Sequence, residues 1–285
     1  MNKYIENKTV EEQLAQIANI LLINGTLTEC PGLVHGKTGV AIFFFHYARY
    51  TENMLFADYA FDLIGLIQNQ IHVNSSADYE RGISGIGIGI NYLVVNGFLI
   101  AEDDICIDLD QRMFRAVMSD PWLDYSLYSG LAGYGRYWIS RLNSQVSILH
   151  ARECLSRIVE FIDENFFDIP FDDRIDVYCF LFDLHRFSGF ESCQKLLLQL
   201  KLYEHEKSFL RLGNSTLGNF IRKLQYDQFF NKSNQIKIYK YLNRIPNLNF
   251  EEPPTSMGLL SGYSGEGLLR LEFISRTNNS WMFLL

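Results

Sequence analysis

Apolar residues recur at helical spacing along almost the whole chain, whereas the alternation that marks a strand is scarce. In the first such segment, Leu14, Ile17 and Leu21 fall on one stripe. Segments with one apolar and one polar face are typical of helices that keep one side in solvent. They are residues 10–22, 56–71, 111–118, 148–166, 191–203 and 233–245.

A second set of predicted helices alternates with the first. These are residues 40–50, 86–95, 134–142, 176–187, 219–224 and 266–275. Several begin with turns that are almost uniformly apolar, as expected of helices buried on most sides. Pairing the two sets gives six helical hairpins, so the sequence predicts an all-α protein.

Two small residues three positions apart introduce five helices of the second set. The copies begin at Gly36, Gly82, Gly130, Ser215 and Gly262. The interval between the third and fourth copies is nearly twice the others, which leaves room for a copy without glycines near residues 176–185. Such a repeat predicts a single domain over residues 1–285, an α/α toroid of about six hairpins whose inner helices ring a cavity. An open solenoid is the alternative.

Composition and charge narrow the classes of function. Hydrophobic residues make up 48% of the chain and charged residues 20%, which excludes a disordered chain. The net charge is −8 and no basic cluster stands out, so neither nucleic acid nor an acidic membrane is an expected partner.

The cysteines and the N-terminus indicate a reducing compartment. The five cysteines are scattered and never form a Cys-x-x-Cys pair, which favours free thiols over a disulfide framework. Residues 1–12 lack the apolar core of a signal peptide. The uncharged run at residues 82–101 contains five glycines and opens on a repeat motif, so we interpret it as a core helix rather than a membrane span. A cytoplasmic protein is expected.

Three segments carry a resemblance to a known family. They read Gly-Leu-Val-His-Gly-Lys-Thr-Gly at 32–39, Tyr-Ser-Leu-Tyr-Ser-Gly-Leu-Ala-Gly at 125–133 and Ser-Met-Gly-Leu-Leu-Ser-Gly-Tyr-Ser-Gly at 256–265. In these motifs, and in the repeat along nearly the whole chain, the protein resembles the lanthionine synthetase C-like family, the peptide cyclases of lanthipeptide biosynthesis. The resemblance implies an α/α toroid with Gly-x-x-Gly at the inner-helix starts. Typical members have seven repeats, about one more than this chain.

The resemblance also implies where a zinc site would lie. In the family, two cysteines and a histidine hold zinc, which lowers the pKa of the substrate thiol so that its thiolate attacks a dehydrated Ser or Thr. In this chain Gly213 stands at the expected cysteine of the Cys-His-Gly motif and Asn214 at the expected histidine. The Trp-Cys-x-Gly motif has no good match, and Ser126 occupies the place of the family's acid, near Asp124. Because neither glycine nor asparagine is a usual zinc ligand, no cofactor is expected.

Candidate binding residues lie beside the repeat motifs, where a toroid would have the rim of its cavity. They are His35, Arg81, Asp124, Tyr128 and His185. Each also has a plain structural interpretation, such as capping or packing for His35. Cys179 and His35 are the remaining metal candidates. Cys179 and His185 would point about 120° apart on one helix, which disfavours a catalytic pair within it.

Three functions compete on these residues. The favoured hypothesis is a zinc-free, non-cyclising relative that binds a peptide or a peptide-modifying enzyme. The alternative is an active zinc-dependent cyclase with a rearranged site drawn from Cys30, His35, Cys179 and His185. The third is an unrelated toroid that cleaves glycans with a pair of carboxylates. Its candidate acids are Asp78, Glu80, Asp124 and Asp183.

Overall fold

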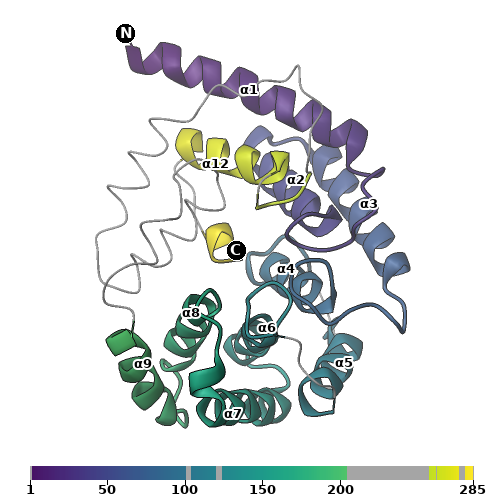
Figure 1. Ribbon diagram of the computed structural model, residues 1–285. Coiled ribbons are helices and arrows are strands. Elements are labelled where there is room, and N and C mark those ends of the chain that lie inside the picture. The colour runs from purple at the N-terminus through teal and green to yellow at the C-terminus, as the bar shows by residue number, and fades with distance from the viewer. Residues whose placement is uncertain are drawn as a thin grey trace. The chain divides into compact units, whose positions relative to one another are not determined.

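The computed structural model describes residues 2–100, 104–119, 124–203, 257–260, 262–275 and 280–284. In these residues the structure contains ten α-helices, two short 3₁₀-helices and no strand (Figure 1). The all-α prediction is therefore confirmed. The helices predicted at 219–224 and 233–245 lie outside the described residues, as does the repeat motif that begins at Ser215.

The two predicted sets of helices alternate along the chain. The amphipathic set comprises α1 (Asn2–Asn24), α3 (Met54–Gln70), α5 (Ile107–Met118), α7 (Ile148–Glu164) and α9 (Ser192–Tyr203). The second set comprises α2 (Lys37–Thr51), α4 (Ile83–Val95), α6 (Leu131–Asn143), α8 (Arg174–Leu184) and α12 (Tyr263–Ser275). The 3₁₀-helices are η1 (Phe166–Asp168) and η3 (Ser280–Leu284).

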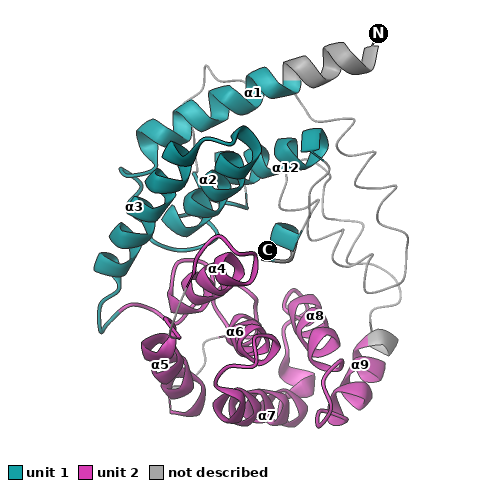
Figure 2. Cartoon of the chain, turned by 180° about the vertical axis from the view of Figure 1, so that it is seen from behind, with its two compact units in different colours: residues 1–74, 214–285 teal, residues 75–213 magenta. Residues whose placement is uncertain are grey.

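The chain divides into two compact units (Figure 2). Unit 1 contains residues 1–74 and 214–285, and unit 2 contains residues 75–213. In unit 1, α2 packs against α3, and α12 packs against both α1 and α2. In unit 2, α6 lies between α4 and α8 and also packs against α7. The two ends of the chain therefore meet in one unit.

One packing contact recurs between neighbouring helices of the second set. A glycine in the first or second turn of one helix faces an aromatic ring of the next, so closely that an added Cβ would clash with the ring. The distances from that Cβ are 2.5 Å from Gly87 to Tyr137, 2.2 Å from Gly135 to Phe180 and 2.3 Å from Gly267 to Phe43. Because these glycines lack a side chain, the helices approach closely along this row.

This row of contacts identifies the copy of the repeat that lacks glycines. Tyr137 lies seven residues after Gly130, the residue before its helix, and Phe180 lies seven residues after Asp173, the residue before α8. Asp173 therefore occupies the position of the first small residue. The last contact joins Gly267 of α12 to Phe43 of α2, so the final described repeat packs against the first as α6 packs against α8.

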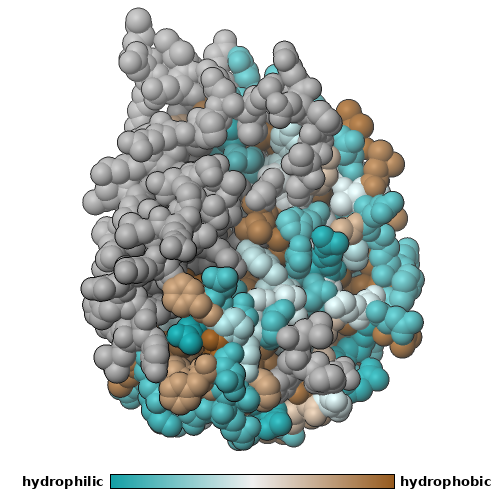
Figure 3. All heavy atoms as spheres, viewed as in Figure 1, coloured by the Kyte–Doolittle hydropathy of each residue, from teal (hydrophilic) through white to brown (hydrophobic). Residues whose placement is uncertain are grey.

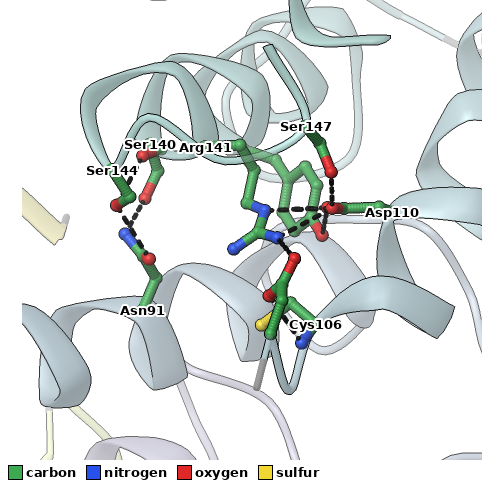
Figure 4. Close-up of polar contacts among 9 residues, drawn as sticks. Asn91, Cys106, Asp110, Ser140, Arg141, Ser144 and Ser147 are labelled. Atoms are coloured by element: carbon green, nitrogen blue, oxygen red, sulfur yellow. Dashed lines mark hydrogen bonds and ion pairs between the residues drawn. The ribbon is translucent and has the colours of Figure 1, made fainter. Parts of the chain in front are cut away.

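A buried ionic network holds three helices of unit 2 together (Figure 4). The carboxylate of Asp110 in α5 accepts hydrogen bonds from Tyr137 at 2.5 Å, from Arg141 of α6 at 2.8 and 2.9 Å, and from Ser147 before α7 at 2.5 Å. Arg141 also pairs with Asp104. A buried ion pair is tolerable only when its remaining polar atoms are bonded, as they are at Asp110. This network is therefore structural, and it was not predicted from the sequence.

The interpretation of residues 82–101 as a core segment agrees with α4. Its residues from Ile83 to Ile90 are all buried. In the described parts of the chain, no helix combines the length and the apolar character that a membrane crossing requires.

Candidate functional site

The candidate binding residues lie in loops that lead into the second set of helices, here called the rim loops, and each unit has its own: residues 30–36 in unit 1, and residues 76–82 and 124–130 in unit 2. In each rim loop, the amide of the first helical residue donates to a carbonyl seven residues earlier. The pairs are Lys37 with Cys30 at 2.9 Å, Ile83 with Ser76 at 2.9 Å and Leu131 with Asp124 at 3.1 Å. These bonds satisfy one of the amides that a helix start leaves without an intrahelical partner.

The first glycine of each motif is required by crowding. Gly36, Gly82 and Gly130 have extended backbones with φ of −124°, −100° and −121°, which any residue can adopt. A Cβ at these positions would lie 2.3 Å from the carbonyl oxygen of Cys30, 2.2 Å from that of Ser76 and 2.3 Å from that of Asp124. The glycines therefore let each loop close over the start of its helix.

Asp124 organises its own rim loop. One carboxylate oxygen accepts hydrogen bonds from the amide and hydroxyl of Ser126, at 2.9 and 2.6 Å, and the other accepts one from the hydroxyl of Ser129 at 2.6 Å. Partial burial raises the pKa of Asp124, but the bonds from both serines outweigh it and hold this pKa below its usual value. Asp124 is therefore an ionised acceptor at neutral pH and is poorly suited to act as a general acid.

Tyr128 connects neighbouring rim loops through its backbone. Its carbonyl accepts the amides of Tyr79 and Glu80 at 2.9 and 3.1 Å. In unit 1 the carbonyl of Val34, at the corresponding position, accepts the amide of Leu260 at 3.2 Å. The predicted candidate Tyr128 thus lies in a rim loop, and the hydrogen bonds that its carbonyl accepts join this loop to the neighbouring one.

At the start of α8, side-chain carboxylates rather than a backbone carbonyl accept the amides of the neighbouring rim loop. Asp176 accepts the amide of Leu127 at 2.8 Å, and Asp173 accepts the amide of Tyr125 at 3.4 Å. Both acids therefore hold the preceding rim loop with side-chain oxygens. Neither was a predicted site residue, although their place in the repeat follows from Phe180.

The remaining rim residues of unit 2 have local roles. Asp78 accepts the amides of Arg81 and Gly82 at 2.7 and 3.1 Å, so it caps the turn before α4. Arg81 pairs with Glu80 at 3.7 Å, with 69% of its side chain exposed. A surface pair of this kind contributes little to stability, so Arg81 can exchange its partner for a ligand.

A second polar cluster in unit 2 contains Tyr79, Arg136, Cys179, Asp183 and Arg186. Burial alone would lower the pKa of Arg136, but Tyr79, Asp183 and Cys179 together raise it. Burial raises the pKa of Asp183, and the two arginines only partly oppose this rise. Burial also raises the pKa of Tyr79 to about 12. Asp183, a candidate glycosidase acid, therefore belongs to an ion-pair cluster.

The rim of unit 1 has a different polar group at its centre. Lys37, only 3% exposed, donates to the carbonyl of Thr28 and to Gln70 at 3.0 Å. Burial lowers the pKa of Lys37, although the nearby Cys30 and Glu29 oppose this shift. His35 is half-buried in the same rim loop. The structure places the candidates Cys30 and His35 in one loop, and Lys37, which follows that loop, was not a predicted site residue.

The structure does not join the other candidates of unit 2 into a site. Cys179 is buried within α8, whereas His185 is exposed at the C-terminal end of that helix, away from the rim loops at its start. Asp124 and Tyr128 share one rim loop, and Tyr128 contacts the neighbouring loop that contains Arg81. Among the residues that the structure describes, no three His, Cys, Asp or Glu side chains gather as metal ligands. Gly213 and Asn214 lie outside those residues.

Comparison with known proteins leaves the resemblance as a hypothesis: no family model matches the chain, and no curated protein matches it. In unit 2 the rim loops present carboxylates and hydroxyls whose hydrogen bonds hold the loops in place. Such an arrangement is suited to binding through its exposed atoms more than to proton transfer.

Proposed function

We propose that this chain is a zinc-free relative of the lanthionine synthetase C-like proteins, which binds a peptide or a peptide-modifying enzyme in the cytoplasm without cyclising a substrate. The proposal includes the fold, an α/α toroid of about six hairpins in one domain. Fold alone does not assign an activity, so the weight rests on the rim residues.

The recurring contacts between helices support the toroid. The glycine-to-ring contact occurs between α4 and α6, between α6 and α8, and again between α12 and α2. In a closed ring every inner helix has the same two kinds of neighbour, so the last repeat must pack against the first. The contact of Gly267 with Phe43 is of that kind.

The proposal that the protein does not cyclise a substrate rests on one observation: the carboxylates of the rim loops in unit 2 accept hydrogen bonds that hold those loops in place. Asp124, which stands closest to the place of the family's acid, accepts three hydrogen bonds within its own loop. The residues in register with two of the family's zinc ligands are Gly213 and Asn214, and a glycine has no side chain to ligate. A rim whose nearest acid is occupied by serines of its own loop, in a chain with Gly213 and Asn214 at two ligand positions, is suited to binding rather than to cyclisation.

Zinc content tests the choice between this proposal and a rearranged cyclase. Protein purified without chelator is expected to hold far less than one zinc per chain. One tightly bound zinc per chain would overturn the proposal. In that case, Ala substitution of Cys30, His35, Cys179 and His185 in turn would identify the ligands by the loss of metal.

A thiol assay tests cyclisation itself. Cyclisation leaves the mass of a peptide unchanged but consumes its thiol, because the sulfur adds across the double bond of the dehydrated residue. A synthetic peptide with one cysteine and one dehydroalanine is therefore incubated with the protein and then alkylated with iodoacetamide. We expect the thiol to remain alkylatable, with and without added zinc, at the rate of the peptide alone. Faster loss of the thiol would favour the cyclase.

A further inference from the structure

The segment that leads from α7 into α8 exposes two large aromatic side chains. Residues 166–173 read Phe-Phe-Asp-Ile-Pro-Phe-Asp-Asp. Phe166 and Ile169 are buried and anchor the segment, whereas Phe167 is 75% exposed and Phe171 is 54% exposed. The outward rings are thus held on a fixed support, and Phe167 itself packs edge-to-face on Phe166 with ring centroids 5.5 Å apart.

A third aromatic side chain connects this segment to the rim. Tyr125 stacks on Phe161 of α7 with ring centroids 5.9 Å apart. Its amide donates to Asp173, and burial together with the charge of Asp168 raises the pKa of its hydroxyl. Tyr125 therefore lies between acids on two sides, Asp168 and Asp173.

Negative charge accumulates around these rings. Asp168 and Asp172 are exposed. Burial raises the pKa of Asp173, the amide of Tyr125 opposes that rise, and the charges of Asp124, Asp176 and Asp172 add to it. The start of α8 accounts for Asp173 and Asp176, because carboxylates are favoured at helix N-termini. It does not account for Asp168 and Asp172, which lie outside the helix. The nearest cation along the chain, Arg174, directs its Nε to the carbonyl of Ile169 at 3.2 Å.

Exposed apolar residues are common on protein surfaces, and on the face in Figure 3 they are interspersed among hydrophilic ones. What distinguishes the present surface is that rings and acids alternate within six residues. Lys and Arg side chains match this pattern, because their ammonium or guanidinium groups pair with carboxylates and also bind aromatic faces. Anionic partners such as nucleic acid or acidic membranes are repelled by the same charges.

We propose that the Phe–Asp patch, composed of Tyr125, Phe167, Asp168, Phe171 and Asp172, is the docking surface for a cationic segment of a bound peptide. This inference rests on the proposed binding function and specifies the chemistry of its ligand: Lys or Arg side chains separated by apolar residues. The cations pair with Asp168 and Asp172, and the intervening apolar groups cover Phe167 and Phe171.

Binding of a defined probe to the full chain tests the patch. The probe is a fluorescein-labelled decapeptide of alternating Lys and Leu, followed by anisotropy, with a Glu–Leu decapeptide as its partner of opposite charge. We expect the Lys–Leu probe alone to bind, more weakly at high salt. D168N/D172N is expected to weaken binding about tenfold, the effect of losing two exposed charge contacts. Equal binding of both probes, or no change in D168N/D172N, would overturn the inference.

Matched variants separate the patch from general effects. D58N/D62N removes the same charge from two exposed positions of α3 and is expected to leave binding unchanged. F167S/F171S is expected to weaken binding about tenfold or more, whereas L149S, which removes an 84% exposed Leu from α7, is expected to have no effect. An equal loss in D58N/D62N or L149S would contradict the assignment. Binding of the wild-type chain to phosphatidylcholine vesicles that requires Phe167 and Phe171 would instead identify the patch as a membrane contact and overturn it.

A selection from a random peptide display library distinguishes failure of this inference from failure of the proposed function. Enrichment of Lys- or Arg-rich peptides whose binding is lost in D168N/D172N supports both. Enrichment of peptides without cations, insensitive to the patch variants, keeps the binding function and overturns the patch. If neither the library nor the Lys–Leu probe yields a binder, the patch and the peptide-binding form of the proposed function are both overturned.

Discussion

The helix starts at Gly130 and at Asp173 lie in neighbouring repeats of unit 2 and are built in different ways. Before α6, the amide of Leu131 reaches the carbonyl of Asp124 seven residues back, and glycine at position 130 makes room for it. Before α8, the amide of Arg174 donates to the carbonyl of Phe171, only three residues back, at 3.4 Å. The loop before α6 is held by a backbone hydrogen bond and by the carboxylate of Asp124, whereas at the start of α8 the carboxylates of Asp173 and Asp176 accept amides of the preceding rim loop.

The difference shows which parts of the repeat can vary. The loop before α8 has no glycine at the motif positions. The ring of Phe180 nevertheless packs against Gly135 of α6, and the carboxylate of Asp176 accepts the amide of Leu127 in the preceding rim loop. The glycine-to-ring contact between α6 and α8 is thus independent of the kind of loop that introduces α8. Asp173 and Asp176 stand in register with Gly130 and Gly133 of the preceding repeat, and they add negative charge next to the Phe–Asp patch.

The largest expected effect concerns the glycine-to-ring contact, which both α6 and α8 make with the preceding helix of their set. Phe180→Ala removes a fully buried ring that packs on Gly135 and is expected to lower the free energy of unfolding by about 3–5 kcal/mol. The control is Phe182→Ala, two residues further along α8. Because the ring of Phe182 is only half-buried, we expect this substitution to lower the free energy of unfolding less. Urea unfolding followed by circular dichroism measures both. If the two variants lose equal stability, the contact with Gly135 does not hold α8 in the repeat.

The glycine start is tested by adding a single methyl group. Gly130→Ala places a Cβ 2.3 Å from the backbone carbonyl of Asp124 and is expected to cost about 3 kcal/mol, because neither backbone can move without opening the loop. Gly65→Ala in α3 is the control, since its Cβ meets nothing within 4 Å. That substitution is expected to stabilise the protein by up to about 1 kcal/mol through helix propensity. Similar effects of the two substitutions would contradict the crowding argument.

The carboxylate start is tested at Asp176. Asp176→Ala leaves the amide of buried Leu127 without its acceptor and is expected to cost about 2 kcal/mol. Asp176→Asn keeps a carbonyl oxygen in place and is expected to recover at least half of that loss in the same urea experiment. A loss in Asp176→Asn as large as in Asp176→Ala would mean that the charge, rather than the hydrogen bond, is what stabilises the start of α8.

The sequence predicted the positions of the helices well and their starts less well. Helix α4 was predicted to begin at residue 86 but begins at Ile83, immediately after Gly82. The second glycine of each motif disfavours a helix by propensity, so the pattern placed the start beyond it. The hydrogen bond from Ile83 to Ser76 starts the helix earlier, and no local propensity reveals that bond.

The predicted site residues illustrate a second difference. Tyr128 was predicted for its side chain, whereas its backbone carbonyl accepts the amides of Tyr79 and Glu80. No sequence pattern distinguishes a residue that acts through its side chain from one that acts through its backbone. The copy of the repeat without glycines was predicted near residues 176–185, but its first position, Asp173, was not, because small residues were the criterion; the ring seven residues later was a usable signal. Lys37 and Arg136 were not predicted as site residues, because the partners of a single cation in an apolar helix are distant in sequence and no local pattern reveals them.

The smallest expected effect is the opposite response of the two acids to pH. The pKa of Asp124 is lowered on folding, so its contribution to stability is present above the unfolded pKa, about 3.9, and is lost as the pH falls through the folded value. The pKa of Asp173 is raised, so its contribution is present below the unfolded pKa and is lost as the pH rises through the folded value. Carboxyl ¹³C NMR, with Asp124→Asn and Asp173→Asn to assign the two signals, is expected to show Asp173 titrating at the higher pH. The reverse order would mean that the serines do not hold Asp124 ionised, and that burial and the neighbouring acids do not raise the pKa of Asp173 at the start of α8.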